Sequence, residues 1–282
     1  MSESSDRISQ HYGSTDLPSR VLSALEQAGK NLSSLTVEDL APLDQFHTRG
    51  LAATRELISL AGVEPGWRVL DVGSGLGGPA RVLASEKNCH VTGVDITKGF
   101  CEVATLLSKL TRLEHVTEFR HGDATALPLE DGQFDLVLTM QIQMNIEGKR
   151  RFYDEIFRVL KPGGRFVFQD IMSGPGGDIH IPVPWATRRE SSFLISTDAL
   201  RETLKQVGFQ IGRLEDTSEE ALAWRKNQLA ATGLAPSPLG IHVVMGEQFA
   251  LMQSNQVRNL EQRRVAYVRG ATSKPKIAEH AA

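Results

Sequence analysis

Residues Val69 to Ala84 read VLDVGSGLGGPARVLA, and this stretch decides the fold. Its apolar start, which runs into Asp71, predicts a strand, and the residues after the glycines predict a helix. The glycines lie at positions 73, 75, 77 and 78. A backbone this rich in glycine turns sharply and approaches a ligand closely, because no side chain intervenes. The helix start presents free amide donors, so the motif alone fits a dinucleotide or an adenosyl ligand.

From Trp67 onward, short apolar runs alternate with helical stretches, which is typical of a parallel sheet covered on both faces. We therefore expect an α/β fold, Rossmann-like and doubly wound, with a mostly parallel seven-stranded sheet. The last strand alternates enough to lie antiparallel at a sheet edge. The expected strands are Arg68 to Val72, His90 to Asp95, Val116 to His121, Phe134 to Met140, Gly164 to Asp170, Phe209 to Leu214 and Arg264 to Gly270.

The chain divides into two expected parts. Residues 1–62 form a polar tail and a helical cap, in which Thr36 to Leu40 is a short capped turn. Residues 63–282 form the main domain, with a Gly- and Pro-rich insertion at about 171–195 that is too long for a simple connector. The C-terminal part adds the helices Ser218 to Ala231 and His242 to Leu260.

Composition excludes several classes of protein. A net charge of -3 and a pI near 6.3 give no broad field for binding nucleic acid or an anionic membrane. The two cysteines, Cys89 and Cys101, belong to no zinc-binding motif, so we expect reduced thiols and no metal. No signal sequence or long apolar run is present, which favours a cytoplasmic location.

Acidic residues follow the next two strands of the expected sheet. Asp95 closes the second strand in HVTGVD, where its carboxylate can accept hydrogen bonds from ribose hydroxyls, and Ile96 comes directly after it. Asp123 and Ala124 follow the third strand in HGDATALP and are placed to meet an adenine; an Asx-type turn is the alternative. Open α/β sheets bind ligands at these carboxyl ends.

The series DVGSGLGG, VTGVD, GDATALP, FDLVLT and LKPGG resembles the motif series of class I methyltransferases. The resemblance covers Trp67 to Asp170. It implies that S-adenosyl-L-methionine is the cofactor and S-adenosyl-L-homocysteine the product. It also implies that the acidic-glycine loop contacts the methionine part, that the second-strand acid binds ribose, and that the Asp after the third strand binds adenine. The residues that would bind the donor are Asp71, Gly73, Gly75, Gly77, Asp95, Ile96, Asp123, Ala124, Gln141 and Tyr12.

A narrower likeness is to the sarcosine/dimethylglycine N-methyltransferase group of small-molecule enzymes. The glycine loop, an early His-Tyr pair and the segment DTSEEALAW carry it, and Tyr12 resembles the lid tyrosine of related enzymes. The chain departs from that group after the fourth strand. Gln141 and Asn145 stand where the group has an acidic residue and a His.

Candidates for the acceptor side come from three segments. Gln141, Gln143 and Asn145 follow the fourth strand, where amides can orient an acceptor. His47 lies just before the cap helix expected at Arg49 to Ala61, and His180 lies in the insertion. Either histidine can serve as a base at neutral pH; structural packing is the alternative for each. An apolar wall is expected from Met140, Met144, Trp185 and Phe193. The expected catalytic residues are thus His47, Asn145 and His180.

The expected function is methyl transfer to the N or O of a small molecule by in-line displacement, which needs alignment and exclusion of water more than a fixed catalytic group. Transfer to carbon or sulfur is the alternative. An NAD(P)-dependent oxidoreductase and a non-catalytic donor-binding module fit less well. The expected partner is a small-molecule acceptor, with no nucleic acid and no membrane, for a monomer or homodimer.

Overall fold

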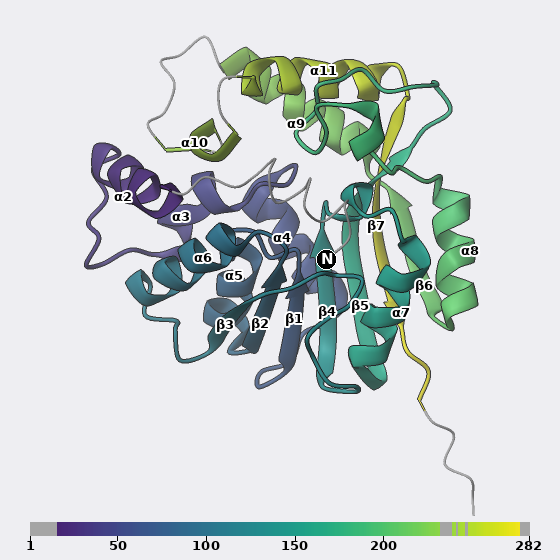
Figure 1. Cartoon of the computed structure of the whole chain (residues 1–282), viewed down its shortest axis with the longest axis horizontal. Helices are drawn as coiled ribbons and strands as arrows, with labels where there is room; N and C mark the ends of the chain where they lie inside the picture. The colour runs from purple at the N-terminus through teal and green to yellow at the C-terminus, as the bar shows by residue number, and fades with distance from the viewer. Residues whose placement is uncertain (1–15, 232–238, 241, 246–247, 277–282) are drawn as a thin grey trace, which may run out of the picture.

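The computed structural model describes residues 16–231, 239–240, 242–245 and 248–276. Its centre is a seven-stranded sheet with the strand order β3-β2-β1-β4-β5-β7-β6 (Figure 1). The predicted fold class is confirmed. The strands are β1 (Arg68–Val72), β2 (His90–Asp95), β3 (Thr117–His121), β4 (Phe134–Met140), β5 (Leu160–Ser173), β6 (Gln210–Asp216) and β7 (Val265–Ser273).

The chain enters the sheet in the middle, at β1. From there it runs outward through β2 to β3 and then returns to β4 on the other side of β1. The pairs among β3, β2, β1, β4 and β5 are all parallel. The direction of winding therefore changes between β1 and β4, and a sheet of this kind binds ligands at that point, beyond the carboxyl ends of the strands.

The position predicted for the last strand is wrong. β7 is antiparallel as expected, but it lies between β5 and β6 and pairs with both, so β6 forms the edge. Gly270 shows this double pairing, since it is opposite Phe168 on one side and Leu214 on the other. Alternation of apolar and polar residues along a strand indicates how the two faces of the sheet are covered. It does not indicate whether the strand has one neighbouring strand or two.

Helices flank the sheet on both faces and continue above its upper edge in Figure 1. The cap turn predicted at residues 36–40 is instead an eight-residue helix, because Thr36 and Asp39 form a reciprocal capping box. The single helix predicted over residues 242–260 is instead two helices. The helices are α2 (Leu17–Gln27), α3 (Val37–Asp44), α4 (Gly50–Ala61), α5 (Gly78–Lys87), α6 (Lys98–Leu110), α7 (Lys149–Val159), α8 (Thr197–Val207), α9 (Ser218–Ala231), α10 (His242–Met245) and α11 (Phe249–Glu261), with short 3₁₀ turns at Gln143–Asn145 and Arg189–Ser191.

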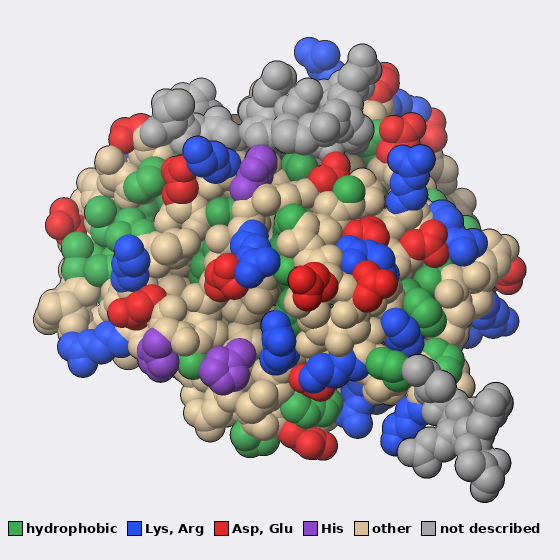
Figure 2. Space-filling model, turned by 60° about the horizontal axis from the view of Figure 1, so that its bottom comes forward, with side chains coloured by type: hydrophobic (Ala, Val, Ile, Leu, Met, Phe, Trp, Pro, Cys, Tyr) green, Lys and Arg blue, Asp and Glu red, His purple; other side chains and the backbone are tan. Residues whose placement is uncertain are grey.

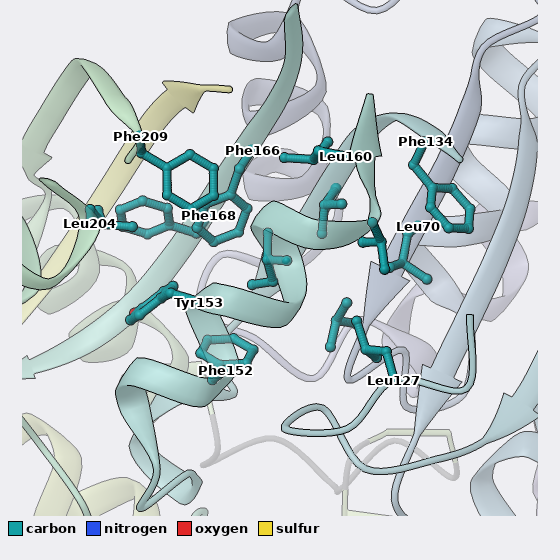
Figure 3. Packing of buried hydrophobic residues seen from close by; sticks show 14 of the residues in the cluster. Leu70, Leu127, Phe134, Phe152, Tyr153, Leu160, Phe166, Phe168, Leu204 and Phe209 are labelled. Carbon is teal, nitrogen blue, oxygen red and sulfur yellow. The ribbon is translucent and has the colours of Figure 1, made fainter. Parts of the chain in front are cut away.

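An aromatic core fills the face of the sheet under α7 and α8. Figure 3 shows Phe166, Phe168 and Phe209 gathered in one group, with Phe152 and Tyr153 of α7 below them. The ring centroid of Phe166 lies 5.2 Å from that of Phe168 and 5.7 Å from that of Phe209. Contacts at these distances add to the burial of apolar surface and fix this half of the sheet.

The opposite face is covered by α4 and α5. Leu57 and Ile58 of α4 belong to the same buried cluster as Val69 of β1 and Leu136 of β4. The last helix of the predicted cap thus packs in the core of the main sheet, whereas α2 and α3 belong to a separate cluster with residues of α6. The segment between α3 and α4 therefore crosses from the cap to the sheet.

The surface carries both signs of charge. Figure 2 shows Lys and Arg side chains interspersed with Asp and Glu on the face in view. Within the described ranges, no helix is long and apolar enough to cross a membrane.

Candidate functional site

A large cavity lies beyond the carboxyl ends of β1, β2, β3 and β4. Its volume is about 1420 Å³, which includes the space at its open mouth. Loops after these strands line one half of it, and the segment after α3 lines a side. Residues of α9, of α11 and of the loop after β5 line the rest. The cavity is therefore at the position that the strand order indicates.

Two glycines of the loop have positive φ, and at Gly73 a neighbouring side chain also leaves no room for a Cβ. Gly73 has φ +73°, and a Cβ there would lie 2.3 Å from Cγ2 of Ile142. Gly75 has φ +53°, and its backbone N–H donates to Oδ2 of Asp95 at 2.9 Å. Both residues line the cavity. Glycine is needed here because L side chains rarely adopt this backbone conformation.

Gly77 has a different role from Gly73 and Gly75. It is the N-cap of α5 and is not among the residues that line the cavity. A Cβ at this position would lie 2.6 Å from the Phe119 ring and 2.8 Å from the Arg81 guanidinium. The structure therefore gives Gly77 a packing role and does not bring it to the site predicted for it.

Asp95 links the first two strand ends. Its Oδ2 accepts from Gly75 N, and its Oδ1 accepts from Thr97 N at 2.8 Å. Burial raises the pKa of Asp95, while these two backbone amides oppose that effect by favouring the carboxylate. A carboxylate has about four lone-pair positions, so it can accept further hydrogen bonds from a ligand in the cavity.

Asp71 is the acid of the glycine loop. Burial, and then the charge of Asp95, raises its pKa to about 7, and its Oδ2 is buried without a hydrogen-bond partner. The residue lines the cavity. A buried carboxyl with an unused oxygen in a cavity is suited to a cationic or hydrogen-bond-donating ligand group.

Replacing Asp71 by asparagine should change how stability depends on pH. The folded protein keeps the Asp71 proton up to about pH 7, whereas the unfolded chain releases it near its ordinary pKa of 3.8. Between these values the native state binds more protons, so the wild-type free energy of unfolding falls as pH rises. The Asp71→Asn variant lacks this decline, and its stability relative to wild type should rise from about pH 4 to pH 7. Urea unfolding of both proteins across this range measures it, and a constant difference would contradict the assignment.

The third strand end supplies the remaining predicted donor-side residues. Oδ1 of Asp123 accepts from the backbone N and the hydroxyl of Thr125, at 2.8 and 2.7 Å. Asp123 and Ala124 line the cavity, and so does Ile96 after β2. The Asx-type turn considered as an alternative is therefore present, together with a position at the cavity.

Residues after β4 contribute strain and two side-chain amides. Gln141 has φ +56°, which is uncommon for a residue with a side chain, and its Nε2 is buried without a partner. Asn145 Nδ2 donates to the carbonyl of Trp185 at 2.7 Å. Both amides line the cavity, as do Met140, Met144 and Trp185, whereas Phe193 does not. Gln143 does not line it either, because its buried Nε2 donates to the carbonyl of Ile171. Strain of this kind persists only where surrounding contacts enforce it, and it is concentrated at functional sites.

His47 lines the cavity and is electrically neutral near pH 7. Burial lowers its pKa to about 4. Its Nε2 lies 3.0 Å from the carbonyl of Gly50, which can only accept, so Nε2 carries the ring proton. Nδ1 is then a hydrogen-bond acceptor. With so low a pKa, the ring is a weak base and is better suited to orienting a donor group.

Two other predicted residues are not brought into the cavity. His180 is absent from the described lining; its Nε2 lies 2.7 Å from Oε1 of Gln262, and its backbone is held by Asn259. These contacts place it beside the end of α11, away from the other candidates. Tyr12 lies outside the described residues.

Part of the cavity wall is built by α9 and α11 and was not expected from the sequence. Trp224 and Arg225 come from α9, and α11 presents Phe249, Gln253 and Gln256. The last three residues are spaced by four and three positions and so share one helix face. That spacing was a signal, but polar residues on it gave no reason to expect burial. Asp44 and Phe46 also line the cavity and were not expected there from the sequence.

No group of three or more His, Cys, Asp or Glu residues that could hold a metal ion occurs in the part of the chain that the structure describes.

Comparison with known families identifies the central part of the chain. Residues 70–168, which run from β1 to β5 and include the glycine loop, Asp95 and Asp123, match the family described as "Methyltransferase domain". This stretch is a class I methyltransferase domain. The predicted membership of that class is thus confirmed, and the order of strands and acidic residues is its structural basis.

The relatives of the methyltransferase domain differ in their named substrates. A glycine/sarcosine/dimethylglycine N-methyltransferase of Actinopolyspora halophila is 29% identical, over 67% of this chain and 35% of its own length. A 24-methylenesterol C-methyltransferase of Arabidopsis thaliana is 31% identical, over 59% of this chain and 48% of its own length. The chain thus spans about a third to a half of the curated relatives it matches. Among solved structures, the cyclase SpnF has a TM-score of 0.71 and 26% identity, with 97% of each chain covered.

Proposed function

We propose that this chain transfers the methyl group of S-adenosylmethionine to a nitrogen or oxygen atom of a small molecule. One observation carries the proposal: the glycine loop, Asp95 and Asp123 meet at one end of a single cavity, in a methyltransferase domain. The open half of the same cavity leaves room for an acceptor. The named activities of the relatives support methyl transfer to small molecules.

The residues present fit the proposed donor. Several residues that line the cavity carry buried polar atoms without partners, among them Asp71 Oδ2, Ser74 Oγ and Gln141 Nε2, and such atoms are rare in folded proteins. Asp95 would accept from the ribose, Asp71 would face the amino group, and Asp123 with Ala124 would meet the adenine. When bound, the donor supplies an activated methyl group on a positively charged sulfur.

The protein then has to align the acceptor and exclude water. Gln141, Asn145 and neutral His47 offer amides and a ring nitrogen for this, and Met140 with Trp185 supplies apolar walls. Alignment of this kind contributes several kcal/mol to a displacement reaction, so no strong base is needed for a neutral amine. His47 would accept a hydrogen bond from the acceptor at Nδ1.

Isothermal titration calorimetry with S-adenosylhomocysteine tests the donor site. The Asp95→Ala variant should bind more weakly by about 1–3 kcal/mol, the cost of losing charge-assisted hydrogen bonds. Asp154→Ala is the matched control, since Asp154 lies on α7 in an exposed pair with Arg150. Failure of the wild type to bind would remove the proposal. Equal affinity of the wild type and Asp95→Ala would remove the ribose assignment.

Transfer to carbon is the second candidate, because one of the relatives is named as a C-methyltransferase. Incubation of the protein with labelled donor and a panel of amines, phenols and carboxylates, followed by mass spectrometry and NMR of the product, identifies the methylated atom. The same assay distinguishes an enzyme from a donor-binding module, which would bind the donor and release no methylated product.

We infer that the protein works in the reducing cytoplasm, as a monomer or homodimer, without nucleic acid or membrane. Both cysteines, Cys89 and Cys101, are buried free thiols, and charges of both signs are interspersed on the face seen in Figure 2. Size-exclusion chromatography with light scattering measures the oligomeric state.

A further inference from the structure

One cationic side chain lines the cavity among the described residues, and it belongs to α9 and not to the loops that follow β1 to β4. Arg225 on α9 is only 4% exposed. Its NH1 donates to Gln253 Oε1 and its NH2 to Thr48 Oγ1, each at 2.5 Å, and NH2 also reaches the Tyr267 hydroxyl at 3.3 Å. These partners are all uncharged. Its Nε is buried and has no partner.

A second buried arginine, Arg81, has a carboxylate partner and so provides a comparison for Arg225. Arg81 and Asp44 are both fully buried and form an ion pair at 2.7 Å. Arg225, in contrast, has no carboxylate within 4.0 Å among the described residues. A guanidinium stays charged at any ordinary pH, and a buried charge without a counter-charge is costly. Since none of the described residues supplies a counter-charge, the arrangement points to a bound group.

The surroundings hold Arg225 in place and add a further polar group. Its guanidinium carbon lies 5.7 Å from the Trp224 ring and 5.9 Å from the Tyr267 ring. Gln256, which also lines the cavity, has a buried Oε1 without a partner. Phe249 and Trp224 line the adjoining wall. The pocket thus combines a fixed cation with aromatic surface, which suits a molecule with an apolar body and an anionic end.

We propose that the methyl acceptor carries an oxyanion, a carboxylate or a phosphate, which Arg225 binds. This inference rests on the methyl transfer proposed above. The strand ends that line the cavity present Asp95 and Asp123, whose carboxylates repel an anion. An acceptor bound through Arg225 therefore has its other end, with the nucleophilic atom, directed to the donor. A guanidinium presents planar N–H donors that match either oxyanion.

Matched pairs of probes that differ in charge test the proposal. The pairs are 4-aminobenzoate with 4-aminobenzamide, 4-hydroxybenzoate with 4-hydroxybenzamide, and O-phosphoethanolamine with ethanolamine. Affinity is measured by calorimetry with S-adenosylhomocysteine bound, and kcat/KM with labelled S-adenosylmethionine. The charged member of at least one pair should be favoured about ten- to hundredfold, as expected for a charge-assisted contact. The carboxylate and phosphate pairs distinguish the two oxyanions.

Substitution of Arg225 should remove the preference for charge. In Arg225→Met the two members of the favoured pair should differ by less than about threefold, and Arg225→Lys should keep part of the preference. Arg269→Met is the control, because Arg269 is partly buried, pairs with Glu56 and Glu215, and does not line the cavity. Its preference should equal that of the wild type.

The outcomes separate this proposal from the one on which it rests. Wild-type protein that binds S-adenosylhomocysteine but prefers the neutral members, or binds no charged probe, overturns the acceptor assignment and leaves the methyltransferase in place. A preference that survives in a folded Arg225→Met variant also overturns it. If that variant does not fold, the wild-type comparison decides alone. Absence of S-adenosylhomocysteine binding in the wild type would instead remove the donor site.

Discussion

Replacing Gly73 by alanine should weaken binding of S-adenosylhomocysteine by at least about tenfold, or 1.4 kcal/mol. The added Cβ would lie 2.3 Å from Cγ2 of Ile142, and the backbone has φ +73°. Ile142 cannot easily give way, since its side chain is β-branched and its backbone N donates to Asp170 Oδ1 at 2.8 Å. Either the glycine loop or the segment after β4 must move, and both line the cavity. Calorimetry measures the loss.

Gly132→Ala is the matched control for backbone strain. Gly132 has φ +62°, and a Cβ there would meet nothing within 4 Å. It precedes β4 and is not among the cavity residues, so this variant should lose some stability and keep its affinity. If the Gly73→Ala and Gly132→Ala variants bound S-adenosylhomocysteine equally well, the close contact between the Gly73 backbone and Ile142 would have no importance for donor binding.

Removing the buried charge of Arg81 should lower the free energy of unfolding by about 3–5 kcal/mol, because Asp44 is then left as an uncompensated charge. Arg81 NH2 lies 2.7 Å from Asp44 Oδ2, and neither side chain is exposed. The pair joins α3 of the cap to α5 after the glycine loop. Urea unfolding of Arg81→Met measures the effect.

Two further variants distinguish loss of the pair from loss of packing. The double variant Asp44→Leu/Arg81→Met should recover much of the stability, since an apolar pair replaces a buried ion pair at little cost. Arg150→Met breaks the exposed pair with Asp154 and should cost less than about 1 kcal/mol. Equal losses in Arg81→Met and Arg150→Met would show that the buried pair is energetically unimportant.

The sequence predicted the strands well because each one is a short apolar run between strong turn signals. The glycine loop, for example, ends β1 as expected. The neighbours of a strand are decided by tertiary packing, and this explains why β7 was placed at the edge although it pairs with β5 and β6. The length of α3 was underestimated, because the turn predicted at residues 36–40 continues as a helix to Asp44, with Pro42 inside it.

The donor half of the candidate site was predictable, whereas the acceptor half was not. Asp71, Asp95 and Asp123 follow strands directly, so the fold class alone brings them together. Arg225 lies in a helix rich in charged and polar residues, and nothing in its local sequence indicates that Thr48, from the segment before α4, covers it. Contacts between segments this far apart are set by packing. His180 shows the converse, as a reactive residue in a promising loop that packs against α11.

The route of the chain between β6 and β7 has a consequence for how new specificities can arise. The chain leaves the sheet after Asp216, at the end of β6, and returns to it at Val265, at the start of β7. The helices between these two points supply Arg225, Gln253 and Gln256. The two ends of this segment are adjacent, since Asp216 is paired opposite Val268 and Thr217 N donates to Tyr267 O at 2.7 Å. A segment whose ends lie side by side can be exchanged without changing the strand order of its host, provided that its contacts to Thr48 and His180 are exchanged with it. Transplanting residues 217–264 from a relative, together with these contact residues, should therefore change the acceptor of the proposed methyl transfer while the donor loop stays as it is.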